Sequence, residues 1–211
     1  MRIAVIGIGH VGGALGTGWA RAGHDVTFGA RDPSSADVRQ QLAKVAGKAK
    51  LATVADSVAG SEVIVLAVPW AAVPDVLREI GPALSGKILI DCTNPANKLS
   101  VMDHSAGSGG EQVELWAPDA KVVKAFNTTG FENMENPRYA DGAVTMLYAG
   151  NDAGAKKVVH GLAMDLGFDP VDAGGLSQAH SLEIVATLWG ALAYGQKMGR
   201  GIAFRVIRRD N

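Results

Sequence analysis

Three glycines near the amino terminus have the spacing of a phosphate-binding turn. Gly7, Gly9 and Gly12 form the pattern G-x-G-x-x-G, after an apolar run and at the start of a helical apolar stripe. In that context the pattern predicts a dinucleotide site. The first glycine permits a tight turn, the second lets the backbone approach a pyrophosphate, and the third allows the helix to pack closely on the strand. The expected contacts span the whole turn: Gly7, Ile8, Gly9, His10, Val11 and Gly12.

The residues after the second expected strand indicate which dinucleotide binds. An NAD site usually places an acidic residue about 20 residues beyond the glycine turn, to hold the ribose hydroxyls. This chain has Ala30 and Arg31 at that point, and a guanidinium is suited to the 2′-phosphate of NADP. Asp32 precedes Pro33, and we expect it to turn away. The sequence favours NADP(H), with an NAD site that uses Asp32 as the alternative.

Polar and aromatic residues follow three further expected strands. Ligands of doubly wound sheets lie beyond the carboxyl ends of the strands, so these residues should meet in one pocket. The pocket has hydrogen-bonding groups but no obvious proton donor, which a carbonyl reductase needs. It suits hydride transfer between two rings that the protein stacks and aligns. The expected binding residues are Val68, Pro69, Trp70 and Asn94, and Asn127 and Thr128 have a positioning role with no acid or base assigned.

The order of the apolar runs predicts the fold class. Strand and helix patterns alternate through the first ninety residues, which is typical of an α/β, Rossmann-type doubly wound, mostly parallel sheet. A helix over residues 177–198 is apolar nearly all round and must therefore be buried, in a core or in an oligomer interface. We expect a dinucleotide-binding domain over residues 1–150 and a lobe over 151–211 that completes the cleft, or else one continuous domain.

Further elements are expected along the chain. Strands are expected at residues 2–6, 25–28, 50–52, 62–67, 87–91, 122–126, 143–149 and 170–172. Helices are expected from residue 34 to 45, from 73 to 80 and from 152 to 166. Residues 105–112 are expected to form a loop before a short helix that ends at Trp116, either as a linker or as a lid.

Composition limits the function classes. The chain has 211 residues, 20 basic and 21 acidic, so it indicates no nucleic-acid surface and no basic membrane anchor. Its most apolar stretch, Ile184 to Tyr194, is too short to span a bilayer. Cys92 is the only cysteine, which fits a cytoplasmic location and excludes a disulfide within the chain. The apolar final helix suits the interface of a homodimer, with a contact to a partner protein as the alternative.

Several stretches together resemble the NADP oxidoreductase family that uses the deazaflavin coenzyme F-420. They are RIAVIGIGHVGGALGTGWARAGHDVTFGARDP, VIVLAVPWAAV, DCTNP, KAFNTTGFENM and DAGGLSQAHSLE. The cofactor domain also resembles that of membrane ferric reductases of the six-transmembrane epithelial antigen class. The resemblance implies reversible hydride transfer between NADPH and the deazaflavin ring. It also implies a dinucleotide-binding domain with a small C-terminal helical lobe, the second coenzyme in the cleft between them, and dimers. By position it assigns Ala30 and Arg31 to the 2′-phosphate, Pro69 and Trp70 to the cleft wall, and Asn127 and Thr128 to the region under the rings.

Two other functions stay open at this point. The same cofactor site could serve an NADPH-dependent reductase of a flavin, a quinone or a ferric chelate, with a flavin in place of F-420 as the second substrate. A non-catalytic NADP-binding redox sensor would also carry the glycine turn, but it would consume no NADPH.

Overall fold

One eight-stranded sheet organises the molecule. The structure, a computed structural model, describes residues 1–43, 45, 49–97, 101–102 and 107–209. The strand order is β12-β11-β8-β5-β4-β1-β2-β3, and only the contact between β11 and β8 is antiparallel. The expected Rossmann-type, mostly parallel sheet is confirmed.

The elements have the following bounds. The sheet strands are β1 (Arg2–Ile6), β2 (Asp25–Ala30), β3 (Lys50–Thr53), β4 (Val63–Leu66), β5 (Ile88–Asp91), β8 (Lys121–Ala125), β11 (Thr145–Gly150) and β12 (Asp169–Asp172). Two small antiparallel pairs are β6 (Ala96–Asn97) with β7 (Val101–Met102), and β9 (Arg138–Tyr139) with β10 (Gly142–Ala143). The helices are α1 (His10–Arg21), α2 (Ala36–Ala43), α3 (Val54–Ala59), α4 (Val73–Ile80), α5 (Gly109–Trp116), α6 (Phe131–Glu135), α7 (Ala153–Asp165) and α8 (Ala179–Gly190), with a π-helical turn at Ala191–Gly195.

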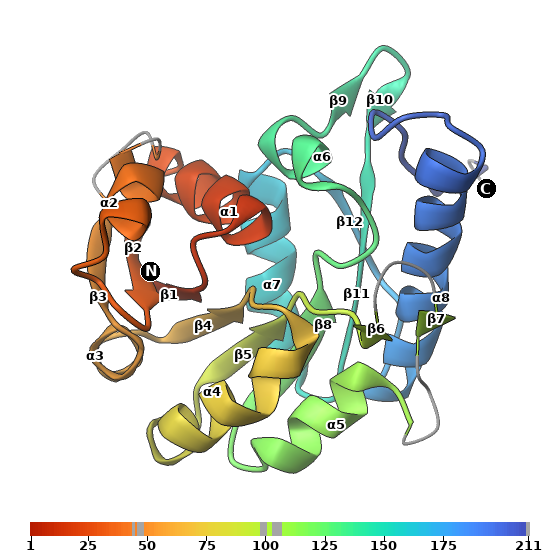
Figure 1. The fold of residues 1–211 in the computed structure, drawn as a ribbon. Helices are drawn as coiled ribbons and strands as arrows, with labels where there is room; N and C mark the ends of the chain where they lie inside the picture. The colour runs from red at the N-terminus through yellow and green to blue at the C-terminus, as the bar shows by residue number, and fades with distance from the viewer. Residues whose placement is uncertain (44, 46–48, 98–100, 103–106, 210–211) are drawn as a thin grey trace.

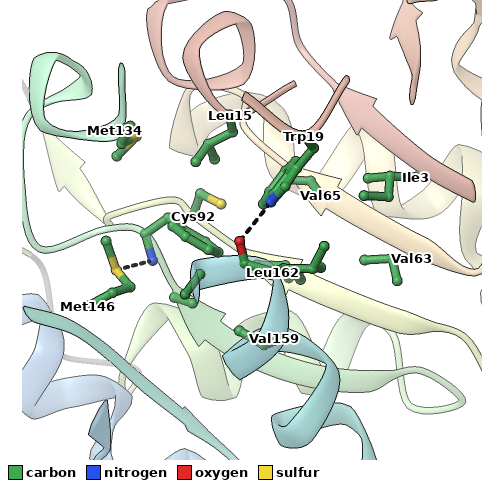
Figure 2. Close-up of a cluster of buried hydrophobic side chains, with 14 of the residues drawn as sticks. Ile3, Leu15, Trp19, Val63, Val65, Cys92, Met134, Met146, Val159 and Leu162 are labelled. Atoms are coloured by element: carbon green, nitrogen blue, oxygen red, sulfur yellow. Dashed lines mark hydrogen bonds between the residues drawn. The ribbon is translucent and has the colours of Figure 1, made fainter. Parts of the chain in front are cut away.

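Helices cover both faces of the sheet (Figure 1). On one face α1 and α7 pack on the strands, and Trp19 of α1 donates from its indole nitrogen to the Leu162 carbonyl of α7 at 3.0 Å (Figure 2). On the other face α3, α4 and α5 enclose a second apolar cluster. Strands covered on both sides are expected to be continuously apolar, as Val63–Leu66 is. With both faces of the sheet covered by helices, a ligand is expected beyond the carboxyl ends of the strands.

The segment before α5 differs from its expectation. The loop expected at residues 105–112 is shorter, because α5 already begins at Gly109, after a Ser108–Glu111 capping box that starts the helix despite two glycines. The expected lid falls partly on residues 103–106, which lie outside the described residues. The helix α3 was not expected at all.

The last helix differs from its prediction in length. It ends as an α-helix at Gly190 and continues only as the π-helical turn, so it does not reach residue 198. Within the chain it is not covered all round, since Ile184 is 51% and Leu188 50% exposed. The helical lobe is present, but β12 continues the same sheet beyond residue 150. The division of the chain at that residue stays a prediction.

The strand order also places a crevice. Successive strands run outward on one side from β1 to β3 and on the other from β4 to β8, so the winding reverses between β1 and β4. At such a switch point the loops at the carboxyl ends diverge and open a ligand crevice. The glycine turn follows β1 there, beside the turn that follows β4.

Candidate active site

The glycine turn has the shape that a pyrophosphate needs. Gly7 has a φ of 102°, and a Cβ on it would lie 2.5 Å from the Ala67 carbonyl oxygen, so only glycine fits. A Cβ on Gly12 would lie 2.0 Å from the Gly7 carbonyl oxygen, which shows how closely α1 packs on the turn. A Cβ on Gly9 would meet nothing within 4 Å. The turn is therefore tight on its inner side and open over Gly9.

The helix that follows supplies the attraction for an anion. The first intrahelical bond runs from the Gly13 N–H to the Gly9 carbonyl at 2.7 Å, so the N–H groups of residues 10–12 precede it. These groups and the helix dipole favour a negative charge at this end. Ile8 and Val11 are half-buried and pack against the core, and His10 is exposed. All six residues of the predicted contact thus lie in the turn and at the start of α1, and their contact with a cofactor stays a prediction.

His10 belongs to a layer of aromatic and charged side chains. The His10 ring stacks on Phe131 of α6, with 4.6 Å between the ring centroids. The Arg200 guanidinium carbon lies 4.8 Å from the centroid of the Phe131 ring. Arg200 also forms an ion pair with Glu132, and its guanidinium carbon lies 5.5 Å from the centroid of the Trp189 ring. Sequence reasoning missed this layer, because Arg200 lies far along the chain from His10 and Phe131.

The end of β2 carries the residues predicted to distinguish NADP from NAD. Ala30 is the last, buried residue of β2, and Arg31 is exposed directly after it. The Asp32 carboxylate accepts from the Ser34 hydroxyl at 2.6 Å and from the Ser34 N–H at 2.9 Å. These hydrogen bonds lower the pKa of Asp32 and hold its charge within its own turn. Asp32 is exposed as well, but its carboxylate is engaged by Ser34, whereas Arg31 extends from the strand end as an exposed cation.

Two asparagines meet where β5 and β8 end. Asn94 Nδ2 donates to the Asn127 main-chain carbonyl at 3.1 Å, and Asn127 Nδ2 donates to Asn94 Oδ1 at 3.0 Å. The first bond fixes the orientation of both amides, since Asn94 must then present its oxygen to Asn127. Asn127 Oδ1 is left over, and no donor among the described residues reaches it although the residue is only 5% exposed. A buried acceptor without a donor is costly and points to a ligand.

The backbone is strained at this point. Phe126, directly before Asn127, has a φ of 59°, which is unfavourable for a bulky side chain. Its N–H donates to Met146 Sδ at 3.2 Å, as the dashed line in Figure 2 shows. Strain of this kind collects at functional sites. The turn at Phe126 sends the chain away from the strand direction just before Asn127.

The remaining predicted residues follow β4 and β8. Val68 is half-buried and Pro69 exposed after β4, and the Trp70 ring contacts Trp116 of α5 at 5.5 Å between centroids. Trp70 thus has a packing partner, and its role toward a ligand stays a prediction. Thr128 is buried and lines a separate cavity of about 60 Å³ against β11 and the carboxyl-terminal segment.

A larger cavity, of about 480 Å³, runs along the outer side of α1 from the glycine turn to Arg21. It was not expected, because its walls combine α1 with α6 and the residues around α2.

Among the described residues no group of three or more His, Cys, Asp or Glu could hold a metal ion. The structure also contains no helix, within its described part, that is long and apolar enough to cross a membrane.

Sequence reasoning also missed three buried charges. Lys124, Asp91 and Glu183 are each 0% exposed and form ion pairs below the asparagines. The available signal was a charge inside an otherwise apolar strand, in KVVKAF and in KILID.

Cys92, directly after Asp91, is buried in the core, and burial raises its thiol pKa well above the usual value. Its surroundings are those of a packing residue rather than of a nucleophile.

Comparison with known proteins places this geometry in a family. A family model described as NADP oxidoreductase coenzyme F420-dependent matches residues 2–95. The F420-dependent NADP reductase of Methanothermobacter marburgensis is 30% identical over 206 residues, which cover 89% of this chain and 90% of that protein. The chain belongs to the F420-dependent NADP oxidoreductase family. As a member of this family it is an NADP-dependent oxidoreductase, and NADP(H) is its cofactor.

Further proteins are similar to this chain over all or part of its length. The crystal structure of a putative F420-dependent NADP reductase from Arthrobacter sp. FB24 has a TM-score of 0.86 and 35% identity, over 99% of this chain and 100% of that one. The rat metalloreductase STEAP3 is 30% identical over 186 residues, so the match spans 87% of this chain but 36% of that protein. An imine reductase from Myxococcus stipitatus, 22% identical with a TM-score of 0.68, shares the fold.

Proposed function

We propose that this oxidoreductase transfers hydride between NADP(H) and the deazaflavin coenzyme F-420. The observation that carries the proposal is the free, buried Oδ1 of Asn127 at the carboxyl ends of β5 and β8. That oxygen suits an amide N–H, which both the nicotinamide carboxamide and the deazaflavin ring offer. The names of the relatives that cover most of the chain support the choice of F-420 as the partner.

Each predicted residue takes a role in this proposal. The turn from Gly7 to Gly12 holds the pyrophosphate, and Ala30 and Arg31 hold the ribose 2′-phosphate. Val68, Pro69 and Trp70 form the wall beside the nicotinamide. When bound, NADPH supplies the hydride from its nicotinamide ring.

The protein's own contribution at the reacting end is alignment. Asn94 holds the amide of Asn127, and Asn127 presents one acceptor to a ring. The preceding residue is fixed by its bond to Met146, and Thr128 is buried, so the segment has little freedom to move. Fixed, neutral groups lose little entropy when two rings stack, and that is the main requirement of a hydride transfer between cofactors.

The proposal includes a cytoplasmic homodimer, as the sequence indicated. The exposed apolar residues of α8 and its π-helical turn support the dimer, since Ile184, Leu188 and Tyr194 are each about half exposed. A second copy of this chain would cover them.

A panel of acceptors tests the function. The purified protein is mixed with NADPH or with NADH, each with F-420, with free FMN and with a ferric chelate, and the nicotinamide absorbance is followed. We expect rapid loss only with NADPH and F-420. The same loss with NADH would refute the role of Arg31, and no loss with F-420 would refute the proposed acceptor.

A second candidate is reduction of a flavin or a ferric chelate. The match to a metalloreductase over 87% of this chain favours it. Loss of NADPH with FMN or the chelate, but not with F-420, would establish it. Tight binding of NADPH without consumption by any acceptor would instead indicate the redox sensor.

A further inference from the structure

Three charged side chains are completely buried below the proposed reacting end. Lys124 of β8 is the register partner of Asp91 in β5, and its Nζ lies 2.8 Å from Asp91 Oδ2. The same Nζ lies 2.8 Å from Glu183 Oε1 of α8. Burial alone would lower the pKa of Lys124, but the two neighbouring carboxylates raise it above its ordinary value, so Lys124 keeps its charge.

Such a triad is weak evidence for stability. Removing three charges from water is costly, and apolar side chains of similar volume often serve a core equally well or better. Buried ionic groups can instead fix one arrangement of the chain. The geometry around Thr93 shows which arrangement this triad fixes.

The triad holds Thr93 from several sides. Lys124 Nζ donates to the Thr93 carbonyl at 2.6 Å. Asp91 Oδ1 accepts from the Thr93 N–H at 2.9 Å and from its hydroxyl at 2.6 Å. Thr93 is therefore fixed through both its main chain and its side chain, although it lies beyond the end of β5.

The third member of the triad fixes the neighbouring helix. Glu183 accepts from the N–H groups of Gly109 and Gly110 at 3.1 and 3.2 Å, at the start of α5. A Cβ on Gly109 would lie 3.0 Å from Glu183 Oε1 and 3.1 Å from Pro95 Cδ. The start of α5 thus packs on Pro95, and Asn94 lies between two residues whose positions depend on the triad.

We propose that Lys124 is a positioning residue of the hydride-transfer site, which acts through Thr93 on the Asn94–Asn127 amide pair. The inference rests on the proposed function, in which Asn127 Oδ1 receives a ring N–H. Lys124 touches neither cofactor nor acceptor. It holds the segment that holds Asn94, and Asn94 sets the direction of the Asn127 amide.

The chain offers a matched control for Lys124. Lys87, directly before β5, donates from Nζ to the carbonyls of Val58 at 2.6 Å and Ser61 at 2.9 Å. It therefore also donates to main-chain oxygens, but at the amino-terminal ends of the strands, opposite to the asparagine pair. Lys87→Met should cost stability without altering the amide pair.

The test compares Lys124→Met with Lys87→Met. In the cofactor-free protein, NMR follows solvent exchange of the side-chain amide protons of Asn94 and Asn127. We expect Lys124→Met to accelerate this exchange, to lower kcat with F-420 about tenfold and to change the NADPH KM less than about twofold. Lys87→Met should lower Tm while both amides and kcat stay at wild-type values. Equal effects of the two variants on the amides and on kcat would overturn the inference.

A second variant keeps the test decisive if Lys124→Met fails to fold. Thr93→Val retains the triad and removes only the hydroxyl bond to Asp91. We expect the same faster amide exchange with Tm near the wild-type value, and unchanged exchange would overturn the link. If these amides respond but wild-type protein reduces no acceptor, the proposed function fails, and the catalytic meaning of Lys124 fails with it. If wild-type protein turns over and the amides do not respond, only the positioning role fails.

Discussion

The side-chain oxygen of Asn127 has no donor among the described residues, and its direction is fixed because the amide nitrogen donates to Asn94 Oδ1. The proposed site thus depends on the direction of hydrogen bonds rather than on titration. An acceptor for a ring N–H strengthens alignment but adds little to the binding of a dinucleotide that is held mainly at its phosphates.

Asn127→Ala should therefore slow turnover and leave NADPH binding nearly intact. The loss of one hydrogen bond to the reacting ring should lower kcat about tenfold. Steady-state kinetics with F-420 and fluorescence titration with NADPH measure the two quantities. Asn136→Ala removes an exposed amide after α6 and serves as the control. An unchanged kcat in Asn127→Ala would remove that residue from the pocket.

Arg31 is the exposed cation at the end of β2, and the acid beside it is engaged by Ser34. Arg31→Ala should raise the Kd of NADPH at least about tenfold, because a charged hydrogen bond to the 2′-phosphate is lost. The Kd of NADH should hardly change, because NADH lacks that phosphate. Arg78→Ala, on the exposed side of α4, controls for net charge. Parallel weakening of both nucleotides would argue against a 2′-phosphate contact.

Among single residues, the sequence could predict which side chains meet at the ends of neighbouring strands. Asn94 and Asn127 follow apolar runs, and parallel strands bring such ends together. Lys124 could not be understood in the same way. Its partners Asp91 and Glu183 lie 33 and 59 positions away along the chain, and only the packed fold shows that the three charges meet.

In the turn between β1 and α1, glycine is needed for two different reasons, close packing of the chain and space for a ligand. At Gly12 the chain itself occupies the space of a Cβ, whereas at Gly9 that space is open. One substitution thus acts on the fold and the other on the ligand.

Gly12→Ala should lower the free energy of unfolding by about 2 kcal/mol or more, because its methyl group would overlap the Gly7 carbonyl. Gly9→Ala should leave Tm close to that of the wild type and weaken NADPH binding, because its methyl group enters the space left for the pyrophosphate. Thermal unfolding with and without NADPH distinguishes the two. Gly13→Ala, whose nearest atom would be 3.8 Å away, is the neutral control. A stable Gly12→Ala protein would contradict the packing at this turn.

At the level of elements, the periodic segments were predicted well and the special ones poorly. The helix α4 begins and ends where the sequence indicates, since its apolar stripe is long and regular. The start of α5 was missed because two glycines, read as a loop, follow the Ser108 cap. A residue count cannot show that those glycines face Glu183 and Ala179, where a side chain would not fit.

The whole molecule exposes apolar side chains along its last helix. Ile184 and Leu188 lie one turn apart on α8 and are 51% and 50% exposed. Their apolar area is most simply covered by the same face of a second copy.

We expect the wild-type protein to elute as a dimer, and the variant Ile184→Glu/Leu188→Glu to elute as a monomer with unchanged NADPH affinity. Size-exclusion chromatography with light scattering measures the mass. Met164→Glu, at a residue of α7 that is 58% exposed, controls for an added charge. A wild-type monomer, or a dimer that survives both glutamates, would show that α8 is not the interface.

The measurement that tests the account most directly follows the hydrogen itself. NADPH that carries deuterium at both C4 positions of the nicotinamide is incubated with the protein and F-420 in ordinary water, and the reduced coenzyme is analysed by mass spectrometry. Direct hydride transfer between aligned rings should leave one deuterium in the reduced F-420. Reduced F-420 without deuterium, or NADPH oxidation that proceeds equally well without F-420, would contradict the proposed reaction.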